Sequence, residues 1–288
     1  MGLVTSIAKC YLNLAPAYPG EYRIHREPLE RAWMEYNDER DGEGFVRFYF
    51  PSLELRGKDV LDLGCGYGGR TVRYGEMGAA YVAGNEVRPE AVEEGFEFAR
   101  LKSADNVEFF LAPAEKLPFP DNRFDIVLSS DVFEHVENFD QSLRESLRVL
   151  NRGGTLCAVF PPFYNATGGS HMHGYVSFSP APNLLFSSSV LRKATEEILT
   201  KRGYDLRFLD PWRPTDRLWS LNGVTIRSFR RTLQNLAFTS ISVKYTPLVT
   251  DLAKHPFVRP VHFVLRGATR VPFLREVMVG RIIAVITK

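Results

Sequence analysis

Residues 60–69 have the composition and spacing of a backbone loop that binds a small ligand. An apolar segment ends at Asp62 and Leu63, and glycines then recur at every second position, 64, 66 and 68. Glycine lets the backbone turn tightly and approach a ligand closely. Glu86 lies 20 positions beyond Gly66, at the end of the next apolar segment, where a carboxylate can accept hydrogen bonds from both hydroxyls of a ribose. These residue types predict a nucleoside site.

The spacing of this loop differs from that of a dinucleotide site. Dinucleotide loops have the pattern G-x-G-x-x-G, whereas this loop reads G-x-G-x-G with Asp62 two residues before it. A pyrophosphate binds at a helix N-terminus, and a carboxylate beside it would repel it. A cationic amino-acid group would instead be attracted to this position.

Alternating strands and helices are expected to position the loop. Short apolar runs that stop at glycine or polar residues are typical of buried parallel strands, and helices with one apolar face separate them. The expected strands are residues 59–63, 81–84, 107–111, 124–128, 155–160, 204–209 and 281–286; the expected helices are 28–50 in large part, 89–101, 139–150 and 190–202. Gly153 and Gly154 are expected to end the third of these helices. The pattern predicts an open α/β sheet that is mostly parallel.

We expect four parts along the chain. They are an N-terminal helical extension at 1–57, a ligand-binding core at 58–210, a basic and aromatic lid insertion at 211–275 and a final core strand within 276–288. If the expected strands 204–209 and 281–286 pair, the insertion between them lies over one end of the sheet.

These motifs together resemble the class I S-adenosylmethionine-dependent methyltransferases, closely over residues 57–160 and in outline elsewhere. The resemblance is carried by the glycine loop, by Glu86, by A-P-A-E-K-L-P-F at 112–119, by S-S-D-V-F-E-H-V at 129–136 and by R-V-L-N-R-G-G at 148–154. The D-V-x-E-H segment is typical of small-molecule O- and C-methyltransferases, including the ubiquinone-biosynthesis type. The resemblance implies a Rossmann-like seven-stranded sheet, mostly parallel, with an antiparallel C-terminal strand.

The resemblance also implies S-adenosyl-L-methionine as cofactor and S-adenosyl-L-homocysteine as product. The residues implied to contact the cofactor are Asp62, Leu63, Gly64, Cys65, Gly66, Gly68, Glu86, Ala114, Glu115 and Asp131. The adenine-side loop of the family usually carries Asp where this chain has Pro113. We expect Glu115, or the backbone N–H of Ala114, to supply the missing polar contact.

Three histidines are candidates for a general base, which methyl transfer needs when the nucleophile bears a proton of high pKa. His135 follows the fourth strand, at the carboxyl edge where α/β proteins bind ligands. Alternatively, His135 and Glu134 orient the following helix. His171 and His173 follow the fifth strand, and on an extended segment both rings lie on one face. A metal would need a third ligand that the neighbouring sequence does not offer, so no metal is expected.

The segment 160–175, FPPFYNATGGSHMHGY, is expected to form one wall of the acceptor pocket. Its Pro-Pro pair resembles the corner of amine methyltransferases in letters only, because it follows the fifth strand instead of the fourth. The glycosylation pattern at Asn165 needs a secretory context that the sequence does not show. Tyr164 is expected to face the acceptor, together with the two histidines of the segment.

Charge is unevenly distributed along a chain with a net formal charge of +2. Residues 211–288 contain 13 Lys and Arg but 3 Asp and Glu, so the rest of the chain is acidic. Arg227, Arg230 and Arg231 are spaced i, i+3 and i+4, on one face of an expected helix. This face is either a solvated side of the lid, or a clamp for phosphate or carboxylate on the acceptor, or a patch that contacts anionic lipid.

The leading hypothesis is methyl transfer to a small-molecule or lipid-linked, anionic acceptor, at oxygen. One alternative is a nucleic-acid methyltransferase, which is disfavoured because basicity alone supplies only nonspecific affinity. Another is a non-catalytic binding protein that kept the fold.

No apolar run reaches the roughly 18 residues of a spanning helix, and the N-terminus lacks a signal-peptide pattern. We therefore expect a cytoplasmic protein with peripheral membrane contact through the basic insertion. The three cysteines predict no disulfide framework. The acceptor's identity and the oligomeric state stay open.

Overall fold

The computed structural model describes residues 2–13, 29–41, 44–166, 182–203, 221–247 and 267–288. The chain divides into two compact units. The sheet unit comprises residues 25–159, 235–243 and 283–288, and the helical unit comprises residues 1–24, 160–234 and 244–282. The four-part division expected from the sequence stays a prediction.

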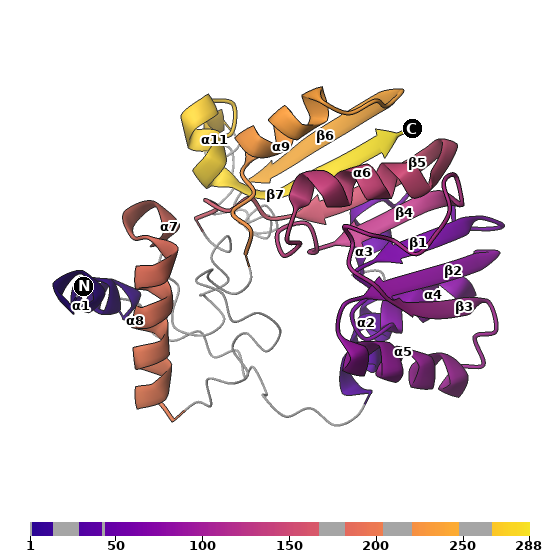
Figure 1. Cartoon of the computed structure of the whole chain (residues 1–288), viewed down its shortest axis with the longest axis horizontal. Helices are drawn as coiled ribbons and strands as arrows, with labels where there is room; N and C mark the ends of the chain where they lie inside the picture. Colours follow the sequence, from indigo (N-terminus) through magenta and orange to yellow (C-terminus); the bar gives the residue numbers. More distant parts are fainter. Residues whose placement is uncertain (1, 14–28, 42–43, 167–181, 204–220, 248–266) are drawn as a thin grey trace. The chain divides into compact units, whose positions relative to one another are not determined.

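A seven-stranded sheet with the order β3-β2-β1-β4-β5-β7-β6 is the central feature of the fold (Figure 1). The strands are β1 Asp59–Leu63, β2 Tyr81–Glu86, β3 Val107–Leu111, β4 Phe124–Ser130, β5 Leu150–Phe160, β6 Ser240–Pro247 and β7 Val279–Thr287. The pairs β1–β2, β2–β3, β1–β4 and β4–β5 are parallel. From β1 the chain first adds β2 and β3 on one side of the sheet and then β4 and β5 on the other side. In open α/β sheets, the ligand binds where this change of side occurs, at the carboxyl ends of the strands, which here are β1 and β4.

The last two strands run antiparallel to their neighbours. The N–H of Gly153 in β5 donates to the carbonyl of Lys288 at 3.0 Å, and the N–H of Lys288 donates back to Gly154 at 3.0 Å. Beside β7, the N–H of Thr239 donates to the carbonyl of Thr287 at 2.8 Å. The predicted mostly parallel, seven-stranded fold with an antiparallel C-terminal strand is therefore confirmed.

One local expectation was wrong, and another lies outside the described residues. β6, which lies within residues 211–275, was not among the strands expected from the sequence. The helix before β5 ends at Val149, and Leu150 already has extended angles (φ −69°, ψ 140°), so Gly153 and Gly154 lie inside β5 instead of ending a helix. The ladder to β4 is irregular there, with a register shift between Phe124 and Ile126. The strand expected at 204–209 falls outside the described residues.

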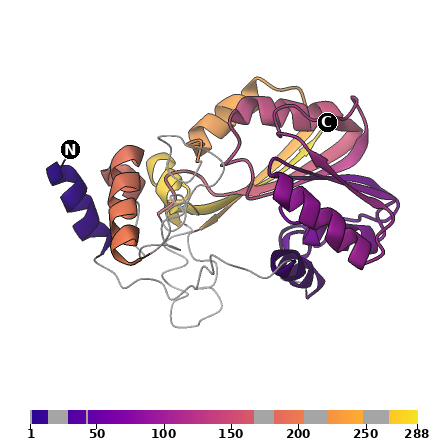
Figure 2. The same ribbon diagram turned by 60° about the horizontal axis from the view of Figure 1, so that its bottom comes forward.

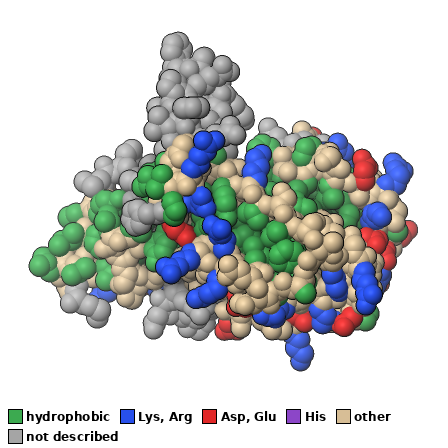
Figure 3. Space-filling model, turned by 90° about the horizontal axis from the view of Figure 1, so that it is seen from above, with side chains coloured by type: hydrophobic (Ala, Val, Ile, Leu, Met, Phe, Trp, Pro, Cys, Tyr) green, Lys and Arg blue, Asp and Glu red, His purple; other side chains and the backbone are tan. Residues whose placement is uncertain are grey.

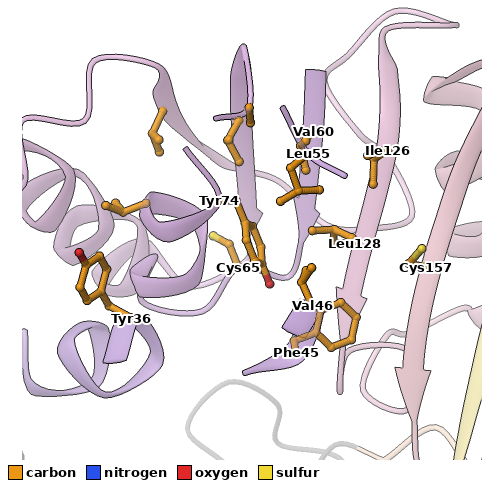
Figure 4. Close-up of a cluster of buried hydrophobic side chains, with 14 of the residues drawn as sticks. Tyr36, Phe45, Val46, Leu55, Val60, Cys65, Tyr74, Ile126, Leu128 and Cys157 are labelled. Atoms are coloured by element: carbon orange, nitrogen blue, oxygen red, sulfur yellow. The ribbon is translucent and has the colours of Figure 1, made fainter. Parts of the chain in front are cut away.

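Helices cover both faces of the sheet unit (Figures 1 and 2). They are α2 Glu30–Arg40, α3 Phe45–Tyr49, α4 Gly69–Glu76, α5 Pro89–Leu101 and α6 Phe139–Val149. α5 begins with Pro89, whose missing N–H costs nothing in the first turn. One buried cluster joins α2, α3 and α4 to β1 and β4 through side chains that include Tyr36, Phe45, Leu55, Tyr74 and Leu128 (Figure 4). The N-terminal helix α2 is thus part of the same core as the glycine loop.

The helical unit contains α1 Gly2–Leu12, α7 Pro182–Leu185, α8 Ser188–Lys201, α9 Ile226–Gln234 and α11 Pro272–Met278. α1 packs against α8 through the buried side chains Ala8, Leu12, Leu191, Ala194 and Ile198. Among the helices that the structure describes, none has the length and apolar character needed to cross a bilayer.

Candidate functional site

The glycine loop connects the end of β1 to the first residue of α4, and its shape requires glycine. Gly64 and Gly66 have φ angles of +68° and +59°, a region that other residues rarely adopt. A Cβ on Gly64 would lie 2.5 Å from Val132 Cγ2, and a Cβ on Gly66 would lie 2.9 Å from Glu35 Oε1. The loop backbone therefore lies directly against both neighbouring side chains.

Asp62 is the acidic residue at the end of β1, and its side chain is buried. Its Oδ2 accepts a hydrogen bond from Thr71 Oγ1 at 2.7 Å, which orients the carboxylate. Burial raises the pKa of Asp62 to about 6, although Arg70 and the Thr71 hydrogen bond act in the opposite direction. A cationic group brought next to this carboxylate would stabilise its ionised form.

Glu35 is a second carboxylate at the loop, and the sequence did not predict it. It comes from α2, and its Oε2 accepts a hydrogen bond from the backbone N–H of Gly69 at 3.2 Å. Burial raises the pKa of Glu35 to about 7, against the lowering effect of Arg70 and of the loop N–H groups. Its position depends on the close docking of α2 on α4, which leaves a Cβ at Gly69 only 1.9 Å from the carbonyl oxygen of Ala32.

Arg70 supplies the positive charge beside these carboxylates. Burial lowers the pKa of Arg70, but Glu35, Tyr74 and Asp62 together raise it above its ordinary value. Arg70 follows the glycine loop directly, so its side chain starts from the first turn of α4. The charge of Arg70 thus acts on both carboxylates of the loop. This combination is complementary to a ligand that carries both a positive and a negative group.

Glu86 lies at the end of β2, as the sequence predicted, with its carboxylate mostly buried. Oε1 accepts hydrogen bonds from the N–H groups of Val87 at 2.8 Å and Arg88 at 3.2 Å. The Arg88 guanidinium contacts Oε2 at 3.2 Å and also donates to the Tyr67 hydroxyl at 3.1 Å. Arg88 therefore holds Glu86 against the loop residue Tyr67.

The adenine-side loop after β3 is anchored to β2 and to the start of α6. The N–H of Ala112 donates to the carbonyl of Glu86 at 2.9 Å, and Ala114 is buried. Glu115 Oε1 accepts hydrogen bonds from the N–H groups of Glu137 and, at 3.0 Å, Asn138. One oxygen of Glu115 is thus engaged with the backbone before α6, so Glu115 positions this loop.

Asp131 and His135 follow β4 at the same edge of the sheet. Asp131 has an unusual φ of +55°, and its N–H donates to Val159 at 2.9 Å. Non-glycine residues in this conformation cluster at functional sites. His135 Nε2 lies 3.9 Å from Oε1 of the buried Glu134.

The remaining predicted site residues do not belong to the described sheet unit. Tyr164, Arg227, Arg230 and Arg231 lie in the helical unit. His171 and His173 fall outside the described residues. Within the described ranges, no three His, Cys, Asp or Glu side chains group closely enough to hold a metal ion.

Comparison with known proteins identifies the family. Residues 61–158 match the methyltransferase domain family. The chain is 30% identical over 189 residues to the ubiquinone/menaquinone biosynthesis C-methyltransferase UbiE of Azotobacter vinelandii, covering 63% of this chain and 70% of that protein. It is 35% identical over 178 residues to the UbiE of Cronobacter sakazakii, covering 58% and 66%. It is 29% identical to the ajmaline N-methyltransferase of Rauvolfia serpentina, covering 49% of this chain and 45% of that enzyme.

Among solved structures, phosphoethanolamine N-methyltransferase 2 of Haemonchus contortus in complex with S-adenosyl-L-methionine shares the fold. Its TM-score is 0.53 at 15% identity, covering 86% of this chain and 53% of that one. The chain matches about two thirds of the length of the two UbiE relatives and about half of the length of the ajmaline N-methyltransferase.

The sheet order, the glycine loop and the acids at the ends of β1 and β2 are those of a Rossmann-like, nucleoside-binding class of enzyme. The chain belongs to the class I S-adenosylmethionine-dependent methyltransferases and is related to the UbiE-type enzymes. Its cofactor is S-adenosyl-L-methionine, and its product from that cofactor is S-adenosyl-L-homocysteine.

Proposed function

We propose that the glycine loop, Glu35, Asp62, Arg70 and Glu86 together hold S-adenosyl-L-methionine. The observation that carries this proposal is that two carboxylates whose pKa values are raised by burial, Glu35 and Asp62, lie at the loop, where the charge of Arg70 acts on both. The methionine part of the cofactor carries an ammonium and a carboxylate. The ammonium suits the two acids, and the carboxylate suits the guanidinium.

The nucleoside part of the cofactor suits the residues after β2 and β3. Glu86 is oriented by Arg88 and two backbone N–H groups, which keeps its carboxylate ready to accept ribose hydroxyls. Ala114 contributes a backbone N–H for an adenine ring nitrogen. The backbone of Leu63, Gly64, Cys65, Gly66 and Gly68 forms the surface between the two parts.

The bound cofactor supplies a methyl group activated by its sulfonium. The protein's contribution is to hold the acceptor in line with the S–CH₃ bond, and positioning of this kind contributes roughly 7–11 kcal/mol. Asp131 lies at the carboxyl edge of β4, where we place the acceptor end of the site. His135 is our candidate for the group that receives a proton from the acceptor.

For the acceptor, we propose a small-molecule or lipid-linked ring that is methylated at carbon. The support is that two relatives are named as C-methyltransferases of ubiquinone and menaquinone biosynthesis. The relatives' names therefore favour carbon over the oxygen expected from the sequence, and oxygen is the alternative. A patch of the helical unit that contacts anionic lipid would suit such an acceptor.

Transfer of labelled methyl groups tests this proposal. The full chain is incubated with methyl-labelled cofactor and a cell extract, which is then separated into lipid, small-molecule, RNA and protein fractions. We expect label in the lipid or small-molecule fraction, and NMR of the product distinguishes a C–CH₃ from an O–CH₃ group. Label confined to RNA would favour the nucleic-acid alternative.

Calorimetry with the cofactor and with S-adenosyl-L-homocysteine is the second measurement. Binding of both, with micromolar or tighter affinity, is expected. Absence of binding for both ligands would exclude the assigned site in this chain and would favour the non-catalytic alternative.

A further inference from the structure

A groove lies between α9 and α11 of the helical unit, apart from the residues assigned to the cofactor. Its volume is about 940 Å³, and residues of α9, of α11 and of the turn before α9 line it. Four arginines are among its described lining residues: Arg227, Arg230, Arg231 and Arg275. Glu276 is the acidic residue among them, so the described lining carries a net formal charge of +3. In the view onto α9 and α11, basic side chains gather on the visible face beside apolar ones (Figure 3).

Packing on the opposite side of α9 fixes the arginine face. Ile226, Phe229 and Thr232 are buried, and the rings of Phe160 and Phe229 meet edge to face with centroids 5.5 Å apart. Arg227 and Arg230 are exposed on the other side of the helix. Because the apolar face is anchored, the arginines project toward the groove in a defined arrangement.

The carboxylate of Glu276 is already used by the backbone of α9. Its Oε2 accepts a hydrogen bond from the N–H of Ile226 at 2.9 Å, and its Oε1 accepts one from Arg227 N–H at 2.8 Å. Each oxygen therefore caps the first turn of α9. Among the described residues, no ion pair of 4 Å or less joins Glu276 to an arginine side chain of the groove.

Arg275 is held in place on the α11 side of the groove. Its Nε donates to the carbonyl of Thr269 at 2.7 Å, and its guanidinium carbon lies 5.4 Å from the centroid of the Tyr245 ring. Burial raises the pKa of Tyr245, while the charges of Arg230 and Arg275 act to lower it. An α9 arginine and an α11 arginine thus both act electrostatically on the same phenol.

We propose that this groove binds the phosphate group of a phosphorylated ligand, as a monoester or a diphosphate. Guanidinium groups bind phosphate oxygens through two parallel N–H donors, and a dianion relieves the repulsion among clustered arginines. The proposal goes beyond the methyl-transfer function, because it depends on neither the cofactor residues nor the identity of the acceptor. A free phosphate ester and a phospholipid headgroup present the same chemistry to the groove.

Calorimetric titration of the full chain with inorganic pyrophosphate at about 100 mM salt tests the site. The groove variant is Arg227→Gln/Arg230→Gln, and the matched control is Arg100→Gln/Arg152→Gln, which removes the same charge from exposed positions of the sheet unit. We expect saturable binding that weakens at least tenfold in the groove variant and less than twofold in the control. Arg230→Lys should show an intermediate loss, because it keeps the charge but not the paired donors.

Vesicles distinguish the two sources of phosphate. Phosphatidylcholine vesicles with and without phosphatidic acid are sedimented with the same variants. Binding to the acidic vesicles that is lost in the groove variant supports the proposal with a headgroup as ligand, and competition by pyrophosphate supports a common site. Equal loss of binding in the groove and control variants, or no binding of either probe, overturns the proposal.

Cofactor affinity is measured in parallel and should not change in either variant. Failure of the phosphate proposal is therefore distinct from failure of the methyltransferase site.

Discussion

Glu35 Oε2 accepts a hydrogen bond of 3.2 Å from the backbone N–H of Gly69, which joins the N-terminal helix α2 to the first residue of α4. This contact brings a second carboxylate to the loop that also contains Asp62. The cofactor site of this methyltransferase therefore includes, in our proposal, a residue from outside the strand–loop–helix motif that identifies the family.

The pH dependence of stability should report on Glu35. Its pKa is about 7 in the folded protein and about 4.5 in its ordinary state, so the folded form binds the proton more tightly. The contribution of Glu35 to the free energy of unfolding is then fully present below about pH 4.5 and is lost as the pH rises to about 7. Urea denaturation of the cofactor-free protein and of Glu35→Gln across this range should show a difference in slope of up to about 1.4 kcal/mol per pH unit. Parallel curves would contradict the assigned pKa.

Cofactor binding should be linked to the same proton. An ammonium placed beside Glu35 favours the carboxylate, so binding near pH 6 should release a proton, and affinity should rise between about pH 6 and 8. Calorimetry in two buffers of different ionisation enthalpy measures this release directly. Glu35→Gln should reduce the proton release, with Glu97→Gln on the exposed face of α5 as the control.

Arg70 should select for the carboxylate of the cofactor. We expect the wild-type protein to bind decarboxylated S-adenosylmethionine more weakly than the intact cofactor by about 1.5–3 kcal/mol, the usual value of a hydrogen bond to a charged group. In Arg70→Gln the two ligands should bind with similar affinity. Equal discrimination in both proteins would show that another group binds the carboxylate.

Glu86→Ala should weaken cofactor binding by about tenfold to a hundredfold, since a charged acceptor of ribose hydroxyls is removed. The matched control is Glu97→Ala, an exposed carboxylate on α5. Isothermal titration gives both dissociation constants. Unchanged affinity in Glu86→Ala would mean that the ribose lies elsewhere.

Gly69→Ala should destabilise the fold because its Cβ would lie 1.9 Å from the carbonyl oxygen of Ala32, a backbone atom that cannot rotate away. Overpacking of this kind costs about 1–3 kcal/mol. Gly267→Ala is the control, since nothing lies within 4 Å of its added Cβ. Chemical denaturation should give a lower free energy of unfolding for Gly69→Ala than for Gly267→Ala. Equal free energies of unfolding would show that α2 shifts away from α4 without cost.

His135→Gln tests proton transfer. If His135 receives the acceptor's proton, kcat should fall by about 10²–10⁴-fold while the dissociation constant of the cofactor is unchanged. The limb of the pH–rate profile that reports the general base should also disappear. A normal rate with a normal profile would assign the residue to the orientation of the segment after β4.

Much of the sheet could be predicted because its strands are locally encoded. β1, β3 and α5 begin and end at the residues expected from the sequence, since each is an apolar or amphipathic run bounded by glycine, proline or charge. β6 was missed although Ile241, Val243 and Tyr245 alternate with polar residues, which is the period of a strand with one apolar face. These apolar side chains are only partly buried, and they lie in a segment expected to be a lid. The end of α6 was misplaced because a β-strand begins without an intervening turn.

The sequence by itself determined the glycine loop, the positions of Asp62 and Glu86 at the ends of two strands and the methyltransferase family. These residues are close in the chain, and their spacing reflects one local geometry. Only the tertiary structure revealed Glu35 beside Gly69, the effect of the Arg70 charge on both carboxylates and the meeting of α9 with α11. These contacts join residues from separate elements, and their energies depend on burial and on neighbours that spacing along the chain does not encode. The charge of the site is therefore a property of the packed helices as much as of the loop.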